Sequence, residues 1–422
     1  MVDTICIFEG IYYSRLLPLV YFRPTYDLRC GILTLREKIQ LNYPGIPVSL
    51  HSRRYLSDLL KEQNPDFKVN EFDNTVKSCL FINGRVIADN DFSMKIPTKG
   101  SDTLYVNGDT IIAARVSGKN FENLKQAIQD IFTISDFNGL FKQEVDIDYV
   151  NYPWDLVKYN GAQIRKDYER IVNRNQEMMN GTIYEGAHLI NKKDIYIGKG
   201  AVVKPGAVLD ADEGPIYIGE DVKIFPNAVI EGPCYIGDKS LIKVGAKIYE
   251  NTSIGPVCKV GGEVEESIIH SYSNKQHDGF LGHAYLGSWV NLGADTNNSD
   301  LKNNYGSIKV IINDEQIDSG SQFVGLTMGD HSKSAINTMF NTGTVVGVSC
   351  NIFGSGFPDK YIPSFSWGGS EQKTTYALDR SLEVAKRVME RRKIEFTEAD
   401  ERLFNKVFDL TREERKKRGM PH

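Results

Sequence analysis

A step of six residues runs through the middle of the sequence and constrains its fold more than any other feature. Glycine occurs at Gly219, Gly237 and Gly255, eighteen residues apart, and each follows an aliphatic residue. Fixed periods of this kind are typical of repeat architectures. The aliphatic residues recur at every sixth position, at Ile218, Ile224, Ile230, Ile236, Ile242, Ile248, Ile254 and Val260.

The step of six predicts a parallel β-helix with a triangular cross-section. One hexapeptide forms one flat face and its corner, and three of them complete a coil. The aliphatic side chains then point into the prism, while glycine and small residues suit the corners, where the backbone turns. We therefore expect a left-handed parallel β-helix over residues 181–356. The same step returns later, at Phe280, Leu286, Leu292, Phe340, Val346 and Ile352.

The segments on either side of the repeat have different patterns. Before residue 160, short apolar runs alternate with helical patterns, which indicates a Rossmann-like α/β domain with mostly parallel strands. After residue 356, an aromatic loop precedes segments with one apolar helical face. We expect the domains to cover residues 1–160 (α/β domain), 161–180 (linker helix), 181–356 (β-helix) and 357–422 (aromatic loop and C-terminal helices).

Composition and charge exclude several classes of protein. The net charge of −5 and the isoelectric point of about 5.9 do not suggest a nucleic-acid-binding surface. The six cysteines have no paired metal-ligand spacing, which fits a reducing cytoplasm. No apolar stretch of about 18 residues and no leader-like start occur, so we expect a cytoplasmic protein that does not bind a membrane.

The segment "HDGFLGHAYLGSWVNLGADT" (277–296) holds two histidines, His277 and His283, six residues apart. They could form a metal site, act as acid and base, or have no role. In a prism of hexapeptides, an offset of six moves a residue to the equivalent place on the next face. The two side chains then face different sides, and zinc needs three or four convergent ligands. A shared metal site is therefore not expected.

The order of the two halves resembles the bifunctional enzymes that make UDP-N-acetylglucosamine. In that family an N-acetylglucosamine-1-phosphate uridylyltransferase is joined to a glucosamine-1-phosphate N-acetyltransferase, and this chain is most similar to a shorter, alternative bacterial branch. The family segment "HLxYIGDAxIGxxVNIGAGT" carries the general base, and residues 277–296 match it without gaps. The resemblance implies that His277 is the base, that Phe280 and Asn291 contact substrate, and that His283 is a corner residue.

The chemistry of acetyl transfer requires one base and partners for anions. The attacking amine must lose a proton, and a neutral histidine accepts one readily at neutral pH. By resemblance, Glu263 takes the place of a family carboxylate, whereas Glu265 stands where the family has a phosphate-binding lysine. The candidate partners of the sugar phosphate and coenzyme are Lys243, Lys259, Asn274, Lys275 and Lys302.

The N-terminal half resembles the family's nucleotidyltransferase domain, which opens with a loop of the type "GxGxRLxPLTxxxPKPL". Here "FEGIYYSRLLPLVYFRPTYDLRCG" (8–31) keeps the frame around Arg15, and Arg23 and Arg29 could restore positive charge for a nucleotide. The family's metal-binding aspartate position holds Arg85 in "INGRV", but "VNGDT" (106–110) offers Asp109. Asp155 or Asn160 could supply a second Mg²⁺ ligand, as that reaction requires.

The resemblance implies an acetyl-CoA-dependent N-acetyltransferase acting on an amino-sugar 1-phosphate in sugar-nucleotide biosynthesis. It also implies a fused nucleotidyltransferase-like domain, Mg²⁺ if that domain is active, and a homotrimer. Two alternatives stay open. The chain could be a sugar-1-phosphate nucleotidyltransferase whose β-helix only oligomerises, or a non-catalytic protein that binds sugar nucleotides.

Overall fold

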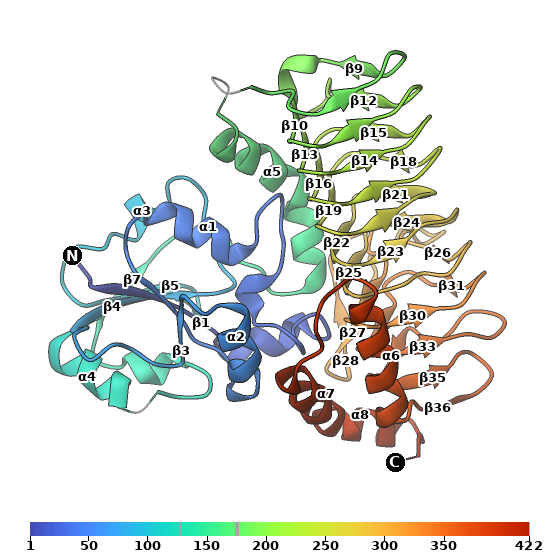
Figure 1. Cartoon of the computed structure of the whole chain (residues 1–422). Coiled ribbons are helices and arrows are strands. Elements are labelled where there is room, and N and C mark those ends of the chain that lie inside the picture. The colour runs from blue at the N-terminus through green and yellow to red at the C-terminus, as the bar shows by residue number, and fades with distance from the viewer. Residues whose placement is uncertain (127, 174–176, 422) are drawn as a thin grey trace.

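The computed structural model describes residues 1–126, 128–173 and 177–421. An α/β domain lies beside a long β-helix, and the C-terminal helices lie between the last coils and that domain (Figure 1). The expected helix over 161–180 is in fact α5, Pro153–Ile171, and residues 174–176 of that range lie outside the described residues. Within the described chain, no helix is both long and apolar enough to cross a membrane.

A seven-stranded mixed sheet forms the core of the N-terminal domain, in the order β3-β2-β1-β4-β6-β5-β7. The first four strands are parallel, and β6 is antiparallel to β4 and β5. The alternation of apolar strands with helices in the sequence thus corresponds to an α/β domain. Its strands are β1 (Thr4–Phe8), β2 (Val48–Leu50), β3 (Lys68–Val69), β4 (Ser78–Asn83), β5 (Thr103–Asn107), β6 (Thr110–Ser117) and β7 (Phe141–Glu144).

Helices cover this sheet, and others form the C-terminal part of the chain. Helix α1 begins with a capping box, in which Thr34 and Glu37 satisfy each other's backbone N–H groups. The α-helices of the chain, besides α5, are α1 (Leu35–Asn42), α2 (Ser57–Gln63), α3 (Phe92–Lys95), α4 (Gly118–Gln126), α6 (Leu378–Glu390), α7 (Glu398–Leu410) and α8 (Arg412–Lys417). Helix α7 packs against α2, so the C-terminal helices contact the N-terminal domain (Figure 1).

Short parallel strands build the three faces of the β-helix, and each strand pairs with its equivalent in the next coil. One face holds β10 (Ile195–Ile197), β13 (Ile216–Ile218), β16 (Cys234–Ile236), β19 (Thr252–Ile254), β22 (Ile268–Ser271), β25 (Tyr285–Ser288), β29 (Thr327–Met328), β32 (Val345–Val346) and β34 (Tyr361–Ile362). The second holds β8 (Thr182–Ile183), β11 (Val202–Val203), β14 (Lys223–Ile224), β17 (Leu241–Ile242), β20 (Lys259–Val260) and β23 (Asn274–Lys275), and continues with β30 (Lys333–Ser334), β33 (Asn351–Ile352) and β35 (Ser366–Gly368). The last strand, β36 (Lys373–Thr375), pairs antiparallel with β35. The third holds β9 (His188–Ile190), β12 (Val208–Asp210), β15 (Val229–Glu231), β18 (Lys247–Ile248), β21 (Glu263–Glu265) and β24 (Phe280–Gly282). Two further strand pairs are β26 (Asn297–Asn298) with β31 (Met339–Phe340) and β27 (Lys309–Ile312) with β28 (Glu315–Asp318).

The predicted aliphatic column is the core of the β-helix. All eight residues from Ile218 to Val260 at the step of six are at most 1% exposed, which confirms the predicted β-helix. Phe280 is an exception among the later positions, because it points outward and Leu281 takes the inward place in register with Val264. The corner after Val260 is shorter, so the next inward residue, Val264, comes after four positions and shifts the later register.

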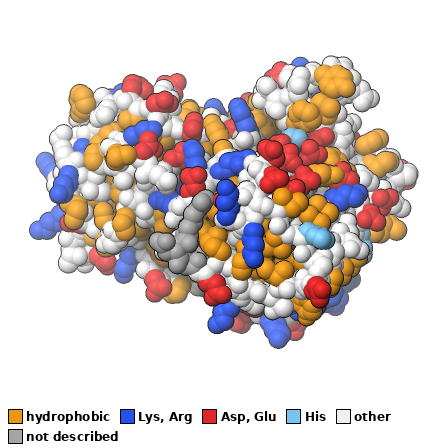
Figure 2. All heavy atoms as spheres, turned by 90° about the horizontal axis from the view of Figure 1, so that it is seen from above, with side chains coloured by type: hydrophobic (Ala, Val, Ile, Leu, Met, Phe, Trp, Pro, Cys, Tyr) orange, Lys and Arg blue, Asp and Glu red, His pale blue; other side chains and the backbone are white. Residues whose placement is uncertain are grey.

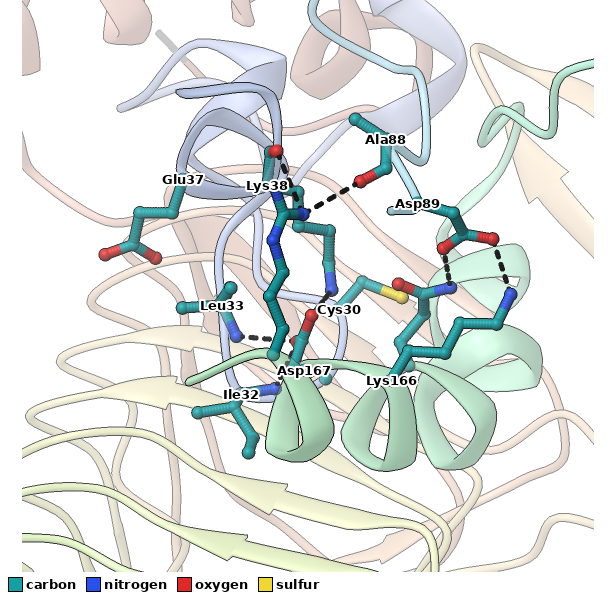
Figure 3. A network of polar contacts seen from close by, with 12 residues as sticks. Cys30, Ile32, Leu33, Glu37, Lys38, Ala88, Asp89, Lys166 and Asp167 are labelled. Carbon is teal, nitrogen blue, oxygen red and sulfur yellow. Dashed lines mark hydrogen bonds and ion pairs between the residues drawn. The ribbon is translucent and has the colours of Figure 1, made fainter. Parts of the chain in front are cut away.

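Buried polar contacts join helix α5 to α1 and to the loop that precedes α1. Nζ of Lys38 forms an ion pair with Asp167 of α5, and Oδ2 of Asp167 accepts hydrogen bonds from the backbone N–H groups of Ile32 (2.9 Å) and Leu33 (3.1 Å) (Figure 3). Both charged side chains are almost fully buried. Removing one partner of a buried ion pair strongly destabilises a protein, because the other charge is left uncompensated. Since Asp167 also binds the backbone of Ile32 and Leu33, the network fixes the loop between residues 29 and 34.

The upper face of the molecule carries charges of both signs. Seen from above, Lys and Arg side chains gather where the N-terminal domain meets the β-helix, and a group of carboxylates lies next to them (Figure 2). No single sign dominates this face. The cation clusters discussed below are therefore local features.

Candidate functional site

His277 lies at a corner of the β-helix directly after β23. Its side chain is exposed, and its backbone carbonyl accepts a 2.7 Å hydrogen bond from Nζ of Lys275. Gly279 has φ of +113°, and a Cβ there would lie 2.3 Å from the carbonyl oxygen of Thr296, so the turn requires glycine. The imidazole is thus presented to solvent from a corner whose backbone is held in place.

Lys275 does not lie on the surface. It occupies an inward position in register with Val260, is 2% exposed, and donates hydrogen bonds from Nζ to the carbonyls of Gly261 (3.1 Å) and His277 (2.7 Å). Burial lowers the pKa of Lys275 to about 8. The expectation that it contacts an anionic substrate is not met, because its ammonium group is turned into the prism, where it holds the His277 corner.

Asn274 and Asn291 lie side by side on the outer surface of the same face. They form a parallel bridge, and Nδ2 of Asn274 lies 3.3 Å from Oδ1 of Asn291. Oδ1 of Asn274 also accepts a 2.8 Å hydrogen bond from Nη2 of Arg392, which follows helix α6. The C-terminal segment therefore reaches the face that carries these two predicted substrate residues.

Four cations gather on this part of the β-helix. Burial lowers the pKa of Lys259, and the charges of Arg392, Arg391 and Lys243 lower it further. We call Lys243, Lys259, Arg391 and Arg392 the basic cluster. Like charges held together favour an anion between them, and phosphate suits guanidinium donors. Sequence reasoning missed the two arginines, although the run "MERRK" (389–393) is a visible signal.

The remaining predicted substrate residues lie elsewhere. Glu263 and Phe280 are neighbours in register on the next face, where Glu263 forms a 3.5 Å ion pair with Lys247. Nζ of Lys302 donates a hydrogen bond to the carbonyl of Ser307, within its own loop. The structure thus brings Asn274, Asn291, Lys243 and Lys259 to one face and places these three outside that group.

His283 has a structural environment that differs from that of His277. Its backbone is left-handed, with φ of +45°, and its ring stacks on Phe323 at 4.8 Å. Nδ1 lies 2.9 Å from Asp300 and Nε2 lies 3.2 Å from Glu266. Burial alone would lower the pKa of His283, but the hydrogen bonds to Asp300 and Glu266 outweigh burial and raise it to about 9. A histidine that holds its proton so firmly is a poor base at neutral pH.

Glu265 lies close to this histidine. Burial raises its pKa, and the neighbouring carboxylates Asp300, Glu250 and Glu266 add to the rise, while His283 opposes it. The residue at the family's lysine position therefore faces the His283 corner and its acidic neighbours. It is not among the residues of the basic cluster.

The N-terminal domain has a cavity of about 290 Å³ at the ends of β1 and β4. Ligands of open α/β sheets bind outside the carboxyl ends of the strands. Arg85 lines the cavity and Arg15 lies beside it, and Oδ1 of Asn151 accepts hydrogen bonds from both, at 3.0 and 3.2 Å. The lining residues are Phe8, Gly10, Ile11, Tyr12, Asn83, Arg85, Asp109, Ile111, Phe132, Thr133 and Ile134.

The three residues predicted to hold Mg²⁺ do not form a metal site. Asn160 is fully buried, and its amide bonds to the backbone of Gly31 and Asn251 and to Ser253. Asp155 accepts the N–H groups of residues 151 and 152 at the start of α5. Only Asp109 lines the cavity, and the described residues contain no group of three or more side chains suited to a metal ion. The residues present do not fit the expected two-carboxylate site.

Arg23 and Arg29 join the domains instead of lining this cavity. Nη2 of Arg23 forms an ion pair with Asp330 and a 3.0 Å hydrogen bond to Oγ of Ser288, both on the β-helix. Arg29 is buried, its backbone N–H donates to the hydroxyl of Tyr285 at 3.0 Å, and its guanidinium lies 5.1 Å from the ring centre of Tyr235 in β16. The prediction that Arg23 and Arg29 bind a nucleotide is therefore wrong for this cavity, since both side chains contact the β-helix at the domain boundary.

A second cavity, of about 370 Å³, lies where the N-terminal domain, the β-helix and the C-terminal helices meet. Its walls include stacked corner residues, with Trp289 between Tyr272 (4.3 Å) and His331 (6.0 Å). Sequence reasoning missed this cavity, because its three walls come from segments far apart in the chain.

The comparisons with known proteins match these two halves separately. A family model described as "Sugar nucleotidyl transferase" matches residues 5–176, and one described as "Bacterial transferase hexapeptide (six repeats)" matches residues 215–250. The resemblance seen in the sequence is thus confirmed for a sugar nucleotidyl transferase domain followed by a hexapeptide repeat. Both models describe transferases, as expected.

Curated relatives carry the name "Bifunctional protein GlmU". The one from Geobacillus sp. (strain WCH70) is 34% identical over 158 residues, which cover 32% of this chain and 33% of that protein. The one from Synechococcus sp. (strain CC9311) is 27% identical over 193 residues, covering 45% and 37%. The one from Acidithiobacillus ferrooxidans (strain ATCC 53993 / BNL-5-31) is 37% identical over 142 residues, covering 32% and 30%. The matches therefore span about a third of the length of these relatives.

Proposed function

We propose that this chain, which joins a sugar nucleotidyl transferase domain to a hexapeptide-repeat β-helix, transfers an acetyl group from acetyl-CoA to the amino group of an amino-sugar 1-phosphate. The observation that carries the proposal is the position of His277. It is exposed at a corner, three residues after Asn274, and Asn274 is bonded to Arg392 of the basic cluster. A candidate base and candidate anion-binding groups on neighbouring parts of the surface support the proposal.

The proposed step uses His277 as the general base. Its imidazole takes a proton from the amine while the nitrogen attacks the thioester carbon, and the coenzyme leaves as the thiol. The basic cluster would bind the phosphates of the sugar or of the coenzyme. Since this surface is open to solvent, we propose that a second copy of the chain forms the opposite wall, as the homotrimer of the resembling family implies.

We further propose that the N-terminal half binds a sugar nucleotide. A catalytic nucleotidyltransferase needs a metal ion to align the phosphates, and the residues expected to hold it do not converge. That observation favours binding over catalysis in this half. Release of pyrophosphate from UTP and a sugar 1-phosphate in the presence of Mg²⁺ would show the opposite.

The test of acetyl transfer is a thiol-release assay with acetyl-CoA and glucosamine 1-phosphate. We expect His277→Ala to lower kcat by about a hundred-fold or more, which is the contribution of a general base. His188→Ala is the matched control, because His188 is an exposed histidine on the first coil. Wild-type protein without turnover on any amino-sugar phosphate, or full activity of His277→Ala, would overturn the proposal.

A further inference from the structure

A buried guanidinium without an anionic partner lies at the wall of the N-terminal cavity. Arg85 is 1% exposed, and Nη1 donates to the carbonyl of Val150 (2.9 Å) and to Oδ1 of Asn151 (3.0 Å). Its buried Nε has no hydrogen-bond partner among the described residues. Among the described residues, neither Arg85 nor Arg15 forms an ion pair with a carboxylate. Both arginines share one neutral amide oxygen instead.

This arrangement is unfavourable unless an anion joins it. A buried charge is normally paired, and an unsatisfied buried donor is destabilising. Burial, followed by the charge of Arg15, lowers the pKa of Arg85 to about 10, so the side chain stays charged at neutral pH. Aromatic rings hold both groups in place, with Arg15 4.1 Å from the ring centre of Tyr12 and Arg85 5.4 Å from that of Tyr149. The carboxylate of Asp155 acts on Arg85 through space, but it binds backbone N–H groups at the start of α5, so the two cations have no carboxylate in direct contact among the described residues.

The adjoining cavity has a lining that suits the rest of a nucleotide. Phe8 and Asn83, the last residues of two parallel strands, form its base, and apolar side chains such as Phe132 and Ile134 line one side. Its volume of about 290 Å³ is at the lower end for a small-molecule site. Apolar walls suit a planar base, and the guanidinium groups suit phosphate oxygens bound in pairs.

We propose that Arg15 and Arg85 bind the diphosphate of a nucleotide in this cavity without a divalent metal ion. The proposal rests on the nucleotide-binding role proposed above for the N-terminal half, and is independent of acetyl transfer. Arg85 stands where the resembling family has a metal-binding aspartate, so its fixed positive charge takes the place of the ion. The exposed carboxylate of Asp109 is then not a ligand.

The test is calorimetric titration of the full chain with UDP, in EDTA and again with Mg²⁺. We expect binding in EDTA that changes little on addition of Mg²⁺. Arg15→Gln should weaken UDP binding about ten- to hundred-fold, since it removes a charge-assisted contact. Asp109→Asn should leave affinity unchanged. Arg54→Gln is the matched control, because Arg54 is an exposed arginine of the same domain that does not line the cavity.

The outcomes separate this proposal from the broader one. Binding only in the presence of Mg²⁺, with loss in Asp109→Asn, would overturn the metal-free site and leave the nucleotide-binding role intact. Absence of UDP binding under both conditions would overturn both. Pyrophosphate titrated alone distinguishes a site for any diphosphate from one that needs the nucleoside. Arg85→Gln, if it folds by circular dichroism, should lose UDP binding, and retention of affinity would contradict the proposal.

Discussion

Nη2 of Arg392 donates a 2.8 Å hydrogen bond to Oδ1 of Asn274, across 118 residues of sequence. A second contact joins the β-helix to α6, where Oγ of Ser349 lies 2.5 Å from Oγ of Ser381. The C-terminal helices are therefore part of the surface that carries the proposed acetyltransferase site. The basic cluster depends on this contact, because two of its four cations come from the segment after α6.

Removal of Arg392 should weaken the binding of the anionic substrates. We expect Arg392→Ala to raise the KM for acetyl-CoA or for the sugar phosphate about ten-fold, with a smaller change in kcat, because the side chain binds an anion and takes no part in proton transfer. Steady-state kinetics check this. Arg387→Ala is the control, since Arg387 pairs with Glu383 on the exposed side of α6. Equal KM values for wild type and Arg392→Ala would contradict the expectation.

The stabilising effect of His283 should depend on pH. Its pKa is raised from 6.5 to about 9 in the folded state by Asp300 and Glu266, against the effect of burial. The folded state therefore binds the proton more tightly, and this stabilisation is complete below pH 6.5 and disappears as pH rises through 9. His283→Asn keeps a residue that tolerates the left-handed backbone. It should lower the free energy of unfolding by up to about 3 kcal/mol at pH 6, from the size of the shift.

Denaturant titrations across the pH range measure this difference. The gap between wild type and His283→Asn should shrink between pH 6.5 and pH 9. A gap that stays constant over that range would show that His283 contributes through packing on Phe323 and not through its charge. His188→Asn is the matched control, because it replaces an exposed histidine on the first coil.

The ion pair between Arg23 and Asp330 should hold the two domains together. Both side chains lie at the boundary, and Asp330 is 3% exposed. Breaking a buried pair leaves one charge uncompensated and costs about 3 to 5 kcal/mol. We expect Arg23→Met to destabilise the chain by about 3 kcal/mol and Arg23→Met/Asp330→Asn to be more stable than the single variant. With the single variant Asp330→Asn these proteins complete a double-mutant cycle, in which additive effects would show that the pair is not coupled.

The sequence predicted the β-helix well because its signal is local. An inward residue at every sixth position needs no knowledge of distant segments, and the column from Ile218 to Val260 is buried as expected. The prediction failed at Phe280 because the corner between Leu281 and Leu286 is one residue short: the two inward residues are five positions apart, so counting back six from Leu286 gives Phe280 instead of Leu281. A periodic pattern cannot show such a deletion when both neighbouring residues are apolar.

Contacts between distant segments explain most errors in the candidate site. Arg23 lies in a motif that resembles a nucleotide loop, but its partner Asp330 is 307 residues away. Asn160 was predicted as a possible second Mg²⁺ ligand, yet its side chain bonds to the β-helix at Asn251. The motifs determined which residue types occur together, whereas docking of the domains determined which of them face a cavity.

Lys275 should control the position of His277 through its buried ammonium group. Nζ holds the carbonyls of Gly261 and His277, so Lys275→Met should release the corner and lower kcat about ten-fold with little change in KM, because the base is displaced while the basic cluster is intact. Lys247→Met is the matched control, since Lys247 lies outward on β18. A rise in KM without loss of kcat would indicate direct substrate binding by Lys275.

The same variant should also show how the buried charge affects stability. Burial lowers the pKa of Lys275 from 10.5 to about 8. The unfolded chain therefore binds more protons between these values, so the wild type gains stability as pH rises from 8 to 10.5. Lys275→Met has no such group, and its stability relative to wild type should fall by up to about 3 kcal/mol over that range. Denaturant titrations at both limits test this, and a parallel pH dependence of the two proteins would show that the ammonium group is not buried in solution.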